Sequence, residues 1–309
     1  MSTSFTRRQA LAAAAIAPVA ATLAPTMALA AAPLQGPAAL RLSNRFALGG
    51  YEVTALLSGT RTVEKPKEIF GLNASDADFA AASDAAFLPT DKAQFFFTPT
   101  LVNTGSELIL FDAGVTAPGI VAALAEAGVT PDQIDTVVLT HMHGDHIGAL
   151  MGDAGPTFAN ARYVTGAVEH NHWSGANNEG FTKNVVPLND RMSFLDDGGS
   201  VASGVTAVAT AGHTPGHMGY MIESDGQQLM LIADVANHPI WSVQNPDWEV
   251  RFDADKAAAA ATRRRVFGML AADRVPFIGY HMPFPALGYV AAEGDGFRYV
   301  PASYQMMLG

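Results

Sequence analysis

The sequence predicts an α+β fold in which two mixed sheets pack face to face and helices cover their outer faces. Apolar segments of strand length occur in groups, an arrangement that favours packed sheets. Segments with helical spacing or composition fall between the groups. The chain of 309 residues is 49% hydrophobic and 15% charged, so it is long and apolar enough to bury a core.

The first group of strands leads up to a histidine-rich motif. Two apolar runs on either side of Thr104-Gly105-Ser106 predict a hairpin. The helix predicted over residues 120–127 ends at Gly128, because glycine commonly terminates helices. The strands predicted in this group are 51–57, 100–103, 108–111 and 136–139.

The second group of predicted strands follows the histidine-rich motif and again alternates with predicted helices, but less regularly. Helices are predicted over residues 167–173 and 253–272, the latter from its richness in alanine and arginine. Residues 65–95 and 174–200 have no periodicity, and we expect loops there that shape a pocket or form plain surface. The strands predicted in this group are 161–164, 205–211, 218–222, 229–232 and 275–279.

The first thirty residues are typical of an export signal. Arg7 and Arg8 precede an alanine-rich apolar run, and Ala28-Leu29-Ala30 matches a small-residue cleavage site. The arginine pair predicts the twin-arginine route, and hence a periplasmic or secreted protein, with an ordinary secretory signal as the alternative. The apolar run is too short and too rich in alanine to favour a membrane anchor.

This signal divides the chain into three predicted segments. Residues 1–30 form the signal, residues 31–48, rich in Ala, Pro and Gly, form an N-terminal arm, and residues 49–309 form the folded domain. No later stretch is long and apolar enough to span a bilayer, so we expect no stable membrane insertion once the signal is removed.

Composition restricts the chemistry that the chain can perform. The sequence contains no cysteine, which excludes disulfides and thiolate metal ligands. Any metal site must therefore use His, Asp and Glu. The formal net charge of −11 makes the protein a poor ligand for nucleic acid, and we expect no such partner.

Seven histidines and aspartates stand at the ends of predicted strands. Packing four such groups into six residues would be costly in repulsion and desolvation, and a bound metal ion removes that cost. The pattern therefore predicts a metal site. The clustered residues are His141, His143, Asp145 and His146, and those further along are His213, Asp234 and His281.

The order of these residues resembles the metallo-β-lactamase superfamily. The string His141-Met142-His143-Gly144-Asp145-His146 is similar to the HxHxDH signature of that superfamily, and residues 212–217 resemble its third motif. Asp112, residues 232–234 and residues 279–281 resemble the first, fourth and last motifs. The resemblance covers roughly residues 100–285 and implies an αββα sandwich.

Further segments are similar to the methyl parathion hydrolase group, whose members are exported dinuclear hydrolases of organophosphates and esters. These segments are residues 51–60, 101–105 and 293–301, so the resemblance extends over nearly the whole predicted domain. Related enzymes are often dimers, and the resemblance therefore allows a homodimer.

The resemblance, combined with coordination chemistry, implies two divalent metal ions. Zn²⁺ suits the nitrogen and oxygen donors best, with Mn²⁺, Fe or Co²⁺ as alternatives. Two ions about 3.5–4 Å apart can share a hydroxide that acts as the nucleophile at neutral pH. The implied ligands are His141, His143 and His213 for one ion, Asp145, His146 and His281 for the other, and Asp234 as the bridge.

Other roles follow from the same resemblance. Asp145 and Asp234 are the predicted catalytic carboxylates. Asp112 and His217 are expected behind the ligands, where they would orient them. We expect Phe97, Trp173 and Phe181 to line an apolar pocket, with core packing as the alternative for each.

The predicted function is metal-dependent hydrolysis of an ester-type bond in a small molecule, either an aryl ester or an organophosphate triester. The main alternative is a lactone hydrolase acting on N-acyl-homoserine lactones. Lactonases of that type often carry a tyrosine three residues after the bridging aspartate, where this chain has Asn237.

Three further classes fit the sequence less well. The β-lactamases that use cysteine are excluded, and a bridging Asp234 points to a dinuclear hydrolase. A glyoxalase II would share the ligands, but the C-terminal segment does not resemble its glutathione-binding region. A non-catalytic metal-binding protein is disfavoured because the ligand set is complete.

Overall fold

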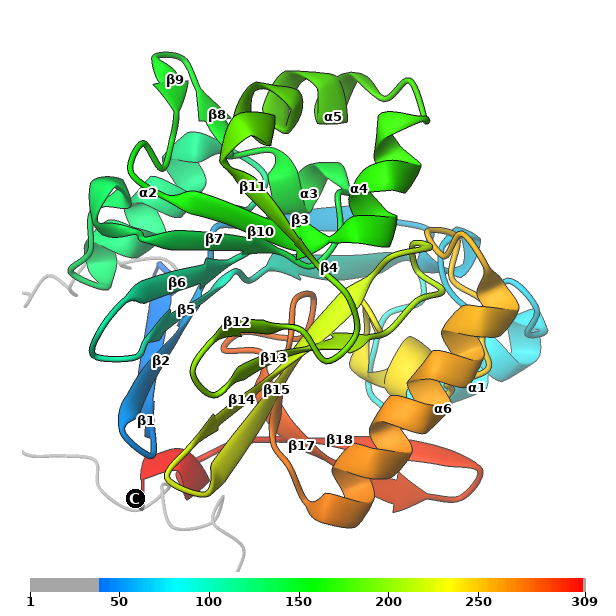
Figure 1. The fold of residues 1–309 in the computed structure, drawn as a ribbon. Coiled ribbons are helices and arrows are strands. Elements are labelled where there is room, and N and C mark those ends of the chain that lie inside the picture. Colours follow the sequence, from blue (N-terminus) through cyan, green and yellow to red (C-terminus); the bar gives the residue numbers. More distant parts are fainter. Residues whose placement is uncertain (1–38, 308–309) are drawn as a thin grey trace, which may run out of the picture. The chain divides into compact units, whose positions relative to one another are not determined.

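The computed structural model describes residues 39–307 of the chain (Figure 1). Contacts divide the chain into two units, residues 1–40 and residues 41–309, and the second contains every helix and strand described below. The predicted signal at residues 1–30 lies outside the described residues. Among the helices that are described, none is both long and apolar enough to cross a membrane.

The first sheet is mixed, with seven strands in the order β1-β2-β5-β6-β7-β10-β11. Its strands pair antiparallel from β1 to β6 and parallel from β6 to β11. The strands are β1 (Ser43–Leu48), β2 (Tyr51–Leu56), β5 (Thr100–Asn103), β6 (Leu108–Phe111), β7 (Thr136–Leu139), β10 (Arg162–Gly166) and β11 (Met192–Leu195).

The second sheet also has seven strands, in the order β12 to β18. All neighbours are antiparallel except β15 and β16, which are parallel and are joined by a long crossover. The strands are β12 (Ser200–Ala202), β13 (Val205–Ala209), β14 (Met218–Ser224), β15 (Gln227–Ala233), β16 (Phe277–Gly279), β17 (Leu287–Glu293) and β18 (Gly296–Pro301).

Helices and two small hairpins complete the domain. The helices are α1 (Asp76–Ala85), α2 (Ala117–Glu126), α3 (Gly144–Ile147), α4 (Ala167–Ser174), α5 (Glu179–Asn184) and α6 (Lys256–Asp273), with a π-helix, η4 (Pro239–Gln244). Short 3-10 turns are η1 (Pro66–Glu68), η2 (Pro131–Gln133), η3 (Val186–Arg191) and η5 (Gln305–Met307). The hairpins pair β3 (Gly59–Glu64) with β4 (Lys92–Phe97), and β8 (Met151–Gly152) with β9 (Gly155–Pro156).

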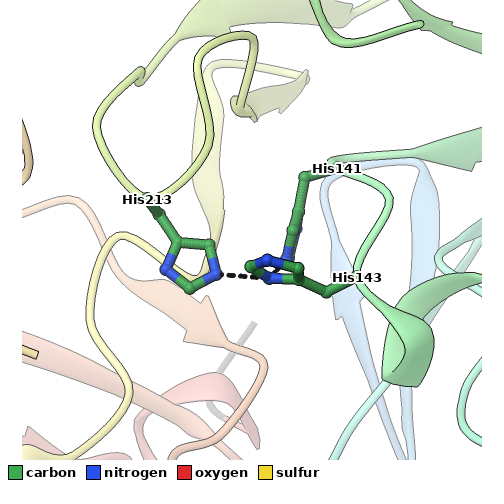
Figure 2. A group of neighbouring side chains, drawn as sticks. All are labelled: His141, His143 and His213. Carbon is green, nitrogen blue, oxygen red and sulfur yellow. Dashed lines mark hydrogen bonds between the residues drawn. The ribbon is translucent and has the colours of Figure 1, made fainter. Parts of the chain in front are cut away.

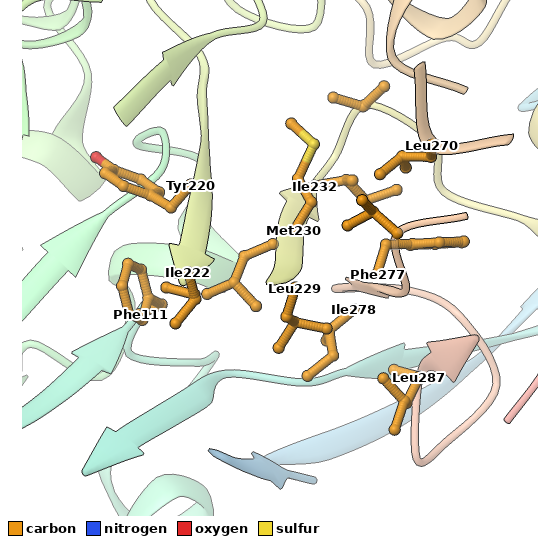
Figure 3. Packing of buried hydrophobic residues seen from close by; sticks show 14 of the residues in the cluster. Phe111, Tyr220, Ile222, Leu229, Met230, Ile232, Leu270, Phe277, Ile278 and Leu287 are labelled. Atoms are coloured by element: carbon orange, nitrogen blue, oxygen red, sulfur yellow. The ribbon is translucent and has the colours of Figure 1, made fainter. Parts of the chain in front are cut away.

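The main core lies between the two sheets (Figure 3). Phe111 of the first sheet meets Tyr220 of the second at a ring-centroid distance of 5.1 Å. Helix α6 packs on the second sheet through Phe267, and α2 packs on the first sheet through Ile120. The predicted α+β fold, with two packed mixed sheets and helices on the outer faces, is confirmed.

Strand β1 lies where the sequence predicts an N-terminal arm. It pairs with β2 along its whole length, and Phe46 and Leu48 are buried whereas Arg45 and Ala47 are exposed. This alternation covers few residues and follows a stretch rich in Ala, Pro and Gly, which hides it in the sequence. This part of the predicted arm therefore belongs to the first sheet.

The two stretches expected to be loops also contain regular structure. Residues 65–95 include α1 and most of β4, and residues 174–200 include α5 and β11. Helix α1 buries only Phe79 and Ser83, so it has no apolar stripe by which the sequence could reveal it. Ser75 begins this helix by accepting a hydrogen bond from the backbone N–H of Asp78.

Because β1 is part of the sheet, truncating Leu48 should destabilise the whole domain. Leu48 is 1% exposed, and we expect Leu48→Ala to lower the free energy of unfolding by about 2–5 kcal/mol. Urea unfolding followed by circular dichroism measures this change. Val121→Ala, at a position 37% exposed on α2, is the control and should change stability little. Equal stability of the two variants would contradict an integral β1.

Candidate metal centre

The seven predicted ligands come together where strands of both sheets end. His141 and His143 follow β7, and Asp145 and His146 belong to the short helix α3, which begins at Gly144. His213 lies in the loop between β13 and β14. Asp234 follows β15, and His281 follows β16. Each ligand is therefore anchored by a strand end or a tight turn next to one.

His141, His143 and His213, the three-histidine group, point their ring nitrogens at one another (Figure 2). The Nδ1 atom of His143 lies 3.1 Å from Nε2 of His141 and 2.9 Å from Nε2 of His213. A neutral imidazole has one N–H and one lone pair, so three rings cannot satisfy one another around one point. The lone pairs converge as they would on a metal ion.

Asp145, His146 and His281, the mixed group, form a second cluster nearby. The Nε2 atom of His281 lies 3.3 Å from Oδ2 of Asp145. Asp234 stands between the two groups: its Oδ2 lies 3.3 Å from Nε2 of His213 and 3.1 Å from Nε2 of His281. The other carboxylate oxygen, Oδ1, lies 3.3 Å from Nε2 of His146. Its position matches the predicted bridge.

The outer ring nitrogens are held by acceptors. Nδ1 of His146 lies 2.8 Å from Oδ2 of Asp112, Nδ1 of His213 lies 2.9 Å from Oδ1 of Asp253, and Nδ1 of His281 lies 2.9 Å from the carbonyl oxygen of Phe96. These partners place the proton on Nδ1 and leave the Nε2 lone pair facing the centre. The rings are thereby fixed in the tautomer that a metal requires.

Charge and burial act differently on the two groups. Burial lowers the pKa of His141 well below its usual value and that of His143 to about 4. Burial also opposes the charged form of His146, but the carboxylates of Asp112, Asp234 and Asp145 outweigh it and raise the pKa of His146 well above its usual value. His141 and His143 are therefore neutral, the form in which imidazole binds metal.

The residues fit a pair of divalent ions. Nε2 of His146 and Oδ1 of Asp234 are buried and form no hydrogen bond, although they lie 3.3 Å apart. Such unpaired buried atoms are costly, and an ion between them would satisfy both. The seven donors are imidazole nitrogens and carboxylate oxygens, a set that suits Zn²⁺.

Asp112 and His217 lie behind the ligands, where the sequence places them. Asp112 accepts hydrogen bonds from the backbone N–H and the hydroxyl of Thr140, beside His141, and its Oδ2 contacts His146. Nε2 of His217 accepts a hydrogen bond from the backbone N–H of Asp234 at 3.1 Å. Burial lowers the pKa of His217 to about 3, so the ring stays neutral and keeps this lone pair.

Sequence reasoning misses further residues that support the ligands. Asp253, which holds His213, is fully buried in an ion pair with Arg263 at 2.9 Å. The hydroxyl of Tyr280 donates to the carbonyl of Asp145 at 2.5 Å. The sequence signal for Asp253 is its place next to the start of the predicted helix, where Asp255 alone suffices to cap α6.

A cavity of about 660 Å³ opens onto the cluster. Phe95, Phe97 and Phe252 form its aromatic wall, and Arg61 contributes a cation. Five of the seven predicted ligands line this cavity, namely His143, Asp145, His213, Asp234 and His281.

Of the aromatics expected in the pocket, Phe97 lines this cavity and Trp173 and Phe181 do not. Trp173 instead packs edge-on against His143 at a ring-centroid distance of 5.6 Å. Phe181 is buried in the core on the outer face of the first sheet, because α5 turns this residue inward.

A two-sheet sandwich with a cluster of histidines and aspartates at its strand ends defines a class of metal-binding proteins. Residues 98–277 match the sequence family described as the metallo-beta-lactamase superfamily, and the chain belongs to that superfamily. The metallo-β-lactamase superfamily predicted from the motifs is therefore confirmed.

Individual relatives are more distant. An N-acyl homoserine lactonase of a Bacillus species is 24% identical over 144 residues, which cover 47% of this chain and 55% of that protein. The chain thus spans about half the length of the curated lactonases that it matches.

Two solved structures share the fold. AidC, a dizinc quorum-quenching lactonase in complex with a product, superposes with a TM-score of 0.78 at 24% identity, over 86% of this chain and 99% of AidC. AbOPH, described as a hydrolase in the beta-lactamase superfamily, gives a TM-score of 0.81 at 23% identity, over 87% of this chain and 100% of AbOPH.

Because the seven predicted ligands converge in two adjoining groups, the protein should bind about two divalent ions per chain. Elemental analysis after reloading chelator-treated protein with Zn²⁺ measures this number. We expect His213→Ala to lose about one ion and His172→Ala, at an exposed position, to lose none. A well-folded wild-type chain that binds no metal would refute the site.

Proposed function

We propose that the protein is a metal-dependent hydrolase of ester-type bonds in apolar small molecules. The observation that carries the proposal is the cavity, whose aromatic wall of Phe95, Phe97 and Phe252 opens directly onto the seven-residue cluster. A substrate bound against this wall would present its scissile bond to the predicted ligands that line the cavity. Concave, mostly apolar sites with a few convergent polar groups are typical of small-molecule binding.

In this proposal, the three-histidine group would hold one ion and the mixed group the other, and Asp234 would serve both. Zn²⁺ is favoured by the donor set, with Mn²⁺, Fe or Co²⁺ as alternatives. When bound, two divalent ions supply Lewis-acid polarisation of the scissile bond and water activated at neutral pH.

Asp145 and Asp234 would have different roles because they differ in access. The side chain of Asp145 is 27% exposed and lines the cavity, whereas that of Asp234 is 3% exposed. Asp145 can therefore accept a proton from water and return it to a leaving group. Asp234 is held by Nδ2 of Asn237 at 2.9 Å and serves to position the two groups.

Acyl lactones are the first substrate class to consider, since a lactonase is among the relatives and another is among the structural neighbours. Aryl esters and aryl phosphotriesters are the second. They are favoured by the phenylalanine wall and by Asn237, which is buried and offers no tyrosine hydroxyl to the substrate.

The proposal also includes export by the twin-arginine route to the periplasm or the medium, and a homodimer as the oligomeric state.

Replacing the exposed carboxylate should remove proton transfer while leaving an oxygen ligand. We expect Asp145→Asn to lower kcat/KM by about 10²–10⁴-fold, the usual contribution of a general acid–base group. Ester hydrolysis by purified, Zn²⁺-loaded protein measures the loss. Asp153→Asn, at an exposed position outside the cavity, should retain wild-type activity. Undiminished activity in Asp145→Asn would remove this residue from the mechanism.

A panel of one acyl lactone, one nitrophenyl ester and one aryl phosphotriester would rank the substrate classes by kcat/KM. We expect the lactone to rank first and Phe97→Ala to raise KM for the nitrophenyl ester, because an aromatic contact is lost. Phe87→Ala, at a position 96% exposed, is the control. Highest activity on the phosphotriester would favour the second class, and no activity on any member would contradict the proposal.

A further inference from the structure

Glu169, in the first turn of α4, is a fully buried carboxylate that pairs with no lysine or arginine in the described part of the chain. It instead accepts four hydrogen bonds. Oε1 accepts from the backbone N–H of Met142 at 3.0 Å and from Nε1 of Trp173 at 2.6 Å. Oε2 accepts from the hydroxyl of Thr214 at 2.7 Å and from the backbone N–H of Gly216 at 3.0 Å.

Three of these four donors belong to the loops that carry the three-histidine group, and the fourth, Trp173, packs against one of its rings. Met142 stands between His141 and His143 in the chain. Thr214 follows His213 directly, and Gly216 lies in the same loop. Trp173 packs edge-on against the ring of His143. A single side chain therefore contacts both loops that carry this group, together with the indole that supports one of its rings.

The mixed group has other supports. Its His146 is held by Asp112, and its His281 by the carbonyl of Phe96. The backbone of Asp145 accepts from Tyr280. None of the hydrogen bonds described for Glu169 reaches these residues or their supports.

The backbone of α4 at Glu169 lies so close to the His213 loop that neither segment can move toward the other. A Cβ atom added to Gly216 would lie 2.1 Å from the backbone nitrogen of Glu169, so the loop lies directly on α4. Burying a carboxylate without a cation is costly unless its oxygens are fully hydrogen-bonded. The four donors meet that condition. Glutamine, the neutral side chain of the same shape, cannot replace this carboxylate, because its NH₂ group would face two hydrogen-bond donors.

We propose that Glu169 is a positioning residue that sets the spacing between the His141–His143 loop and the His213 loop. The metal ion of the three-histidine group depends on this spacing, and the ion of the mixed group does not. This inference rests on the proposed metal site but not on any substrate, so it can be tested with the metal alone.

The test is Zn²⁺ binding by Glu169→Gln, measured by competition with a chromogenic chelator. We expect the affinity for one of the two ions to fall by about 10–100-fold, the usual effect of removing a partner behind a ligand, and the other affinity to remain unchanged. Anomalous diffraction from crystals grown at limiting Zn²⁺ would identify the depleted position. Depletion at the three-histidine group supports the proposal.

Matched variants separate positioning from a general structural role. Glu179→Gln makes the same charge change at an exposed position of α5 and should bind both ions as the wild type does. Thr214→Val removes one donor, keeps the shape of the side chain and leaves Glu169 in place, so it should give a smaller loss at the same ion. It also serves as the test if Glu169→Gln does not fold. Equal weakening of both ions, or of neither, would overturn the proposal.

Discussion

The convergence of seven polar groups at the strand ends is the constraint on which the rest of the structure depends. Imidazole lone pairs and carboxylates repel one another when buried together, so the surrounding protein must hold them at fixed distances. Acceptors behind the rings fix the tautomers, and buried pairs such as Asp253–Arg263 hold those acceptors. The stability of two packed sheets offsets the cost of this arrangement.

The ligands could be predicted from sequence because each lies in a short local pattern. Alternating His141 and His143, followed at once by Asp145 and His146, form a motif that needs no tertiary information. The strands that present them were also predicted, from short segments rich in apolar residues. Strand β7, for example, is buried at all four positions, and its apolar run predicts its bounds.

The supporting residues were invisible for a physical reason. Glu169 and Asp253 look like ordinary solvated carboxylates at helix starts, and only the packing of distant segments buries them. The residues that line the pocket could be predicted only in part, for the same reason. Phe97 lies on a strand whose neighbours face the cavity, whereas the direction of Phe181 depends on a short helix without an apolar stripe.

The parallel pairing of β15 with β16 has a consequence for how such a protein can diversify. Asp234 and His281 are anchored on neighbouring strands, while the crossover between them carries Phe252 at the cavity wall. Insertions or deletions in the exposed parts of this crossover would leave the two ligands in register. The fold thus separates the part of the chain that fixes reactivity from a part that can vary with the molecule to be recognised.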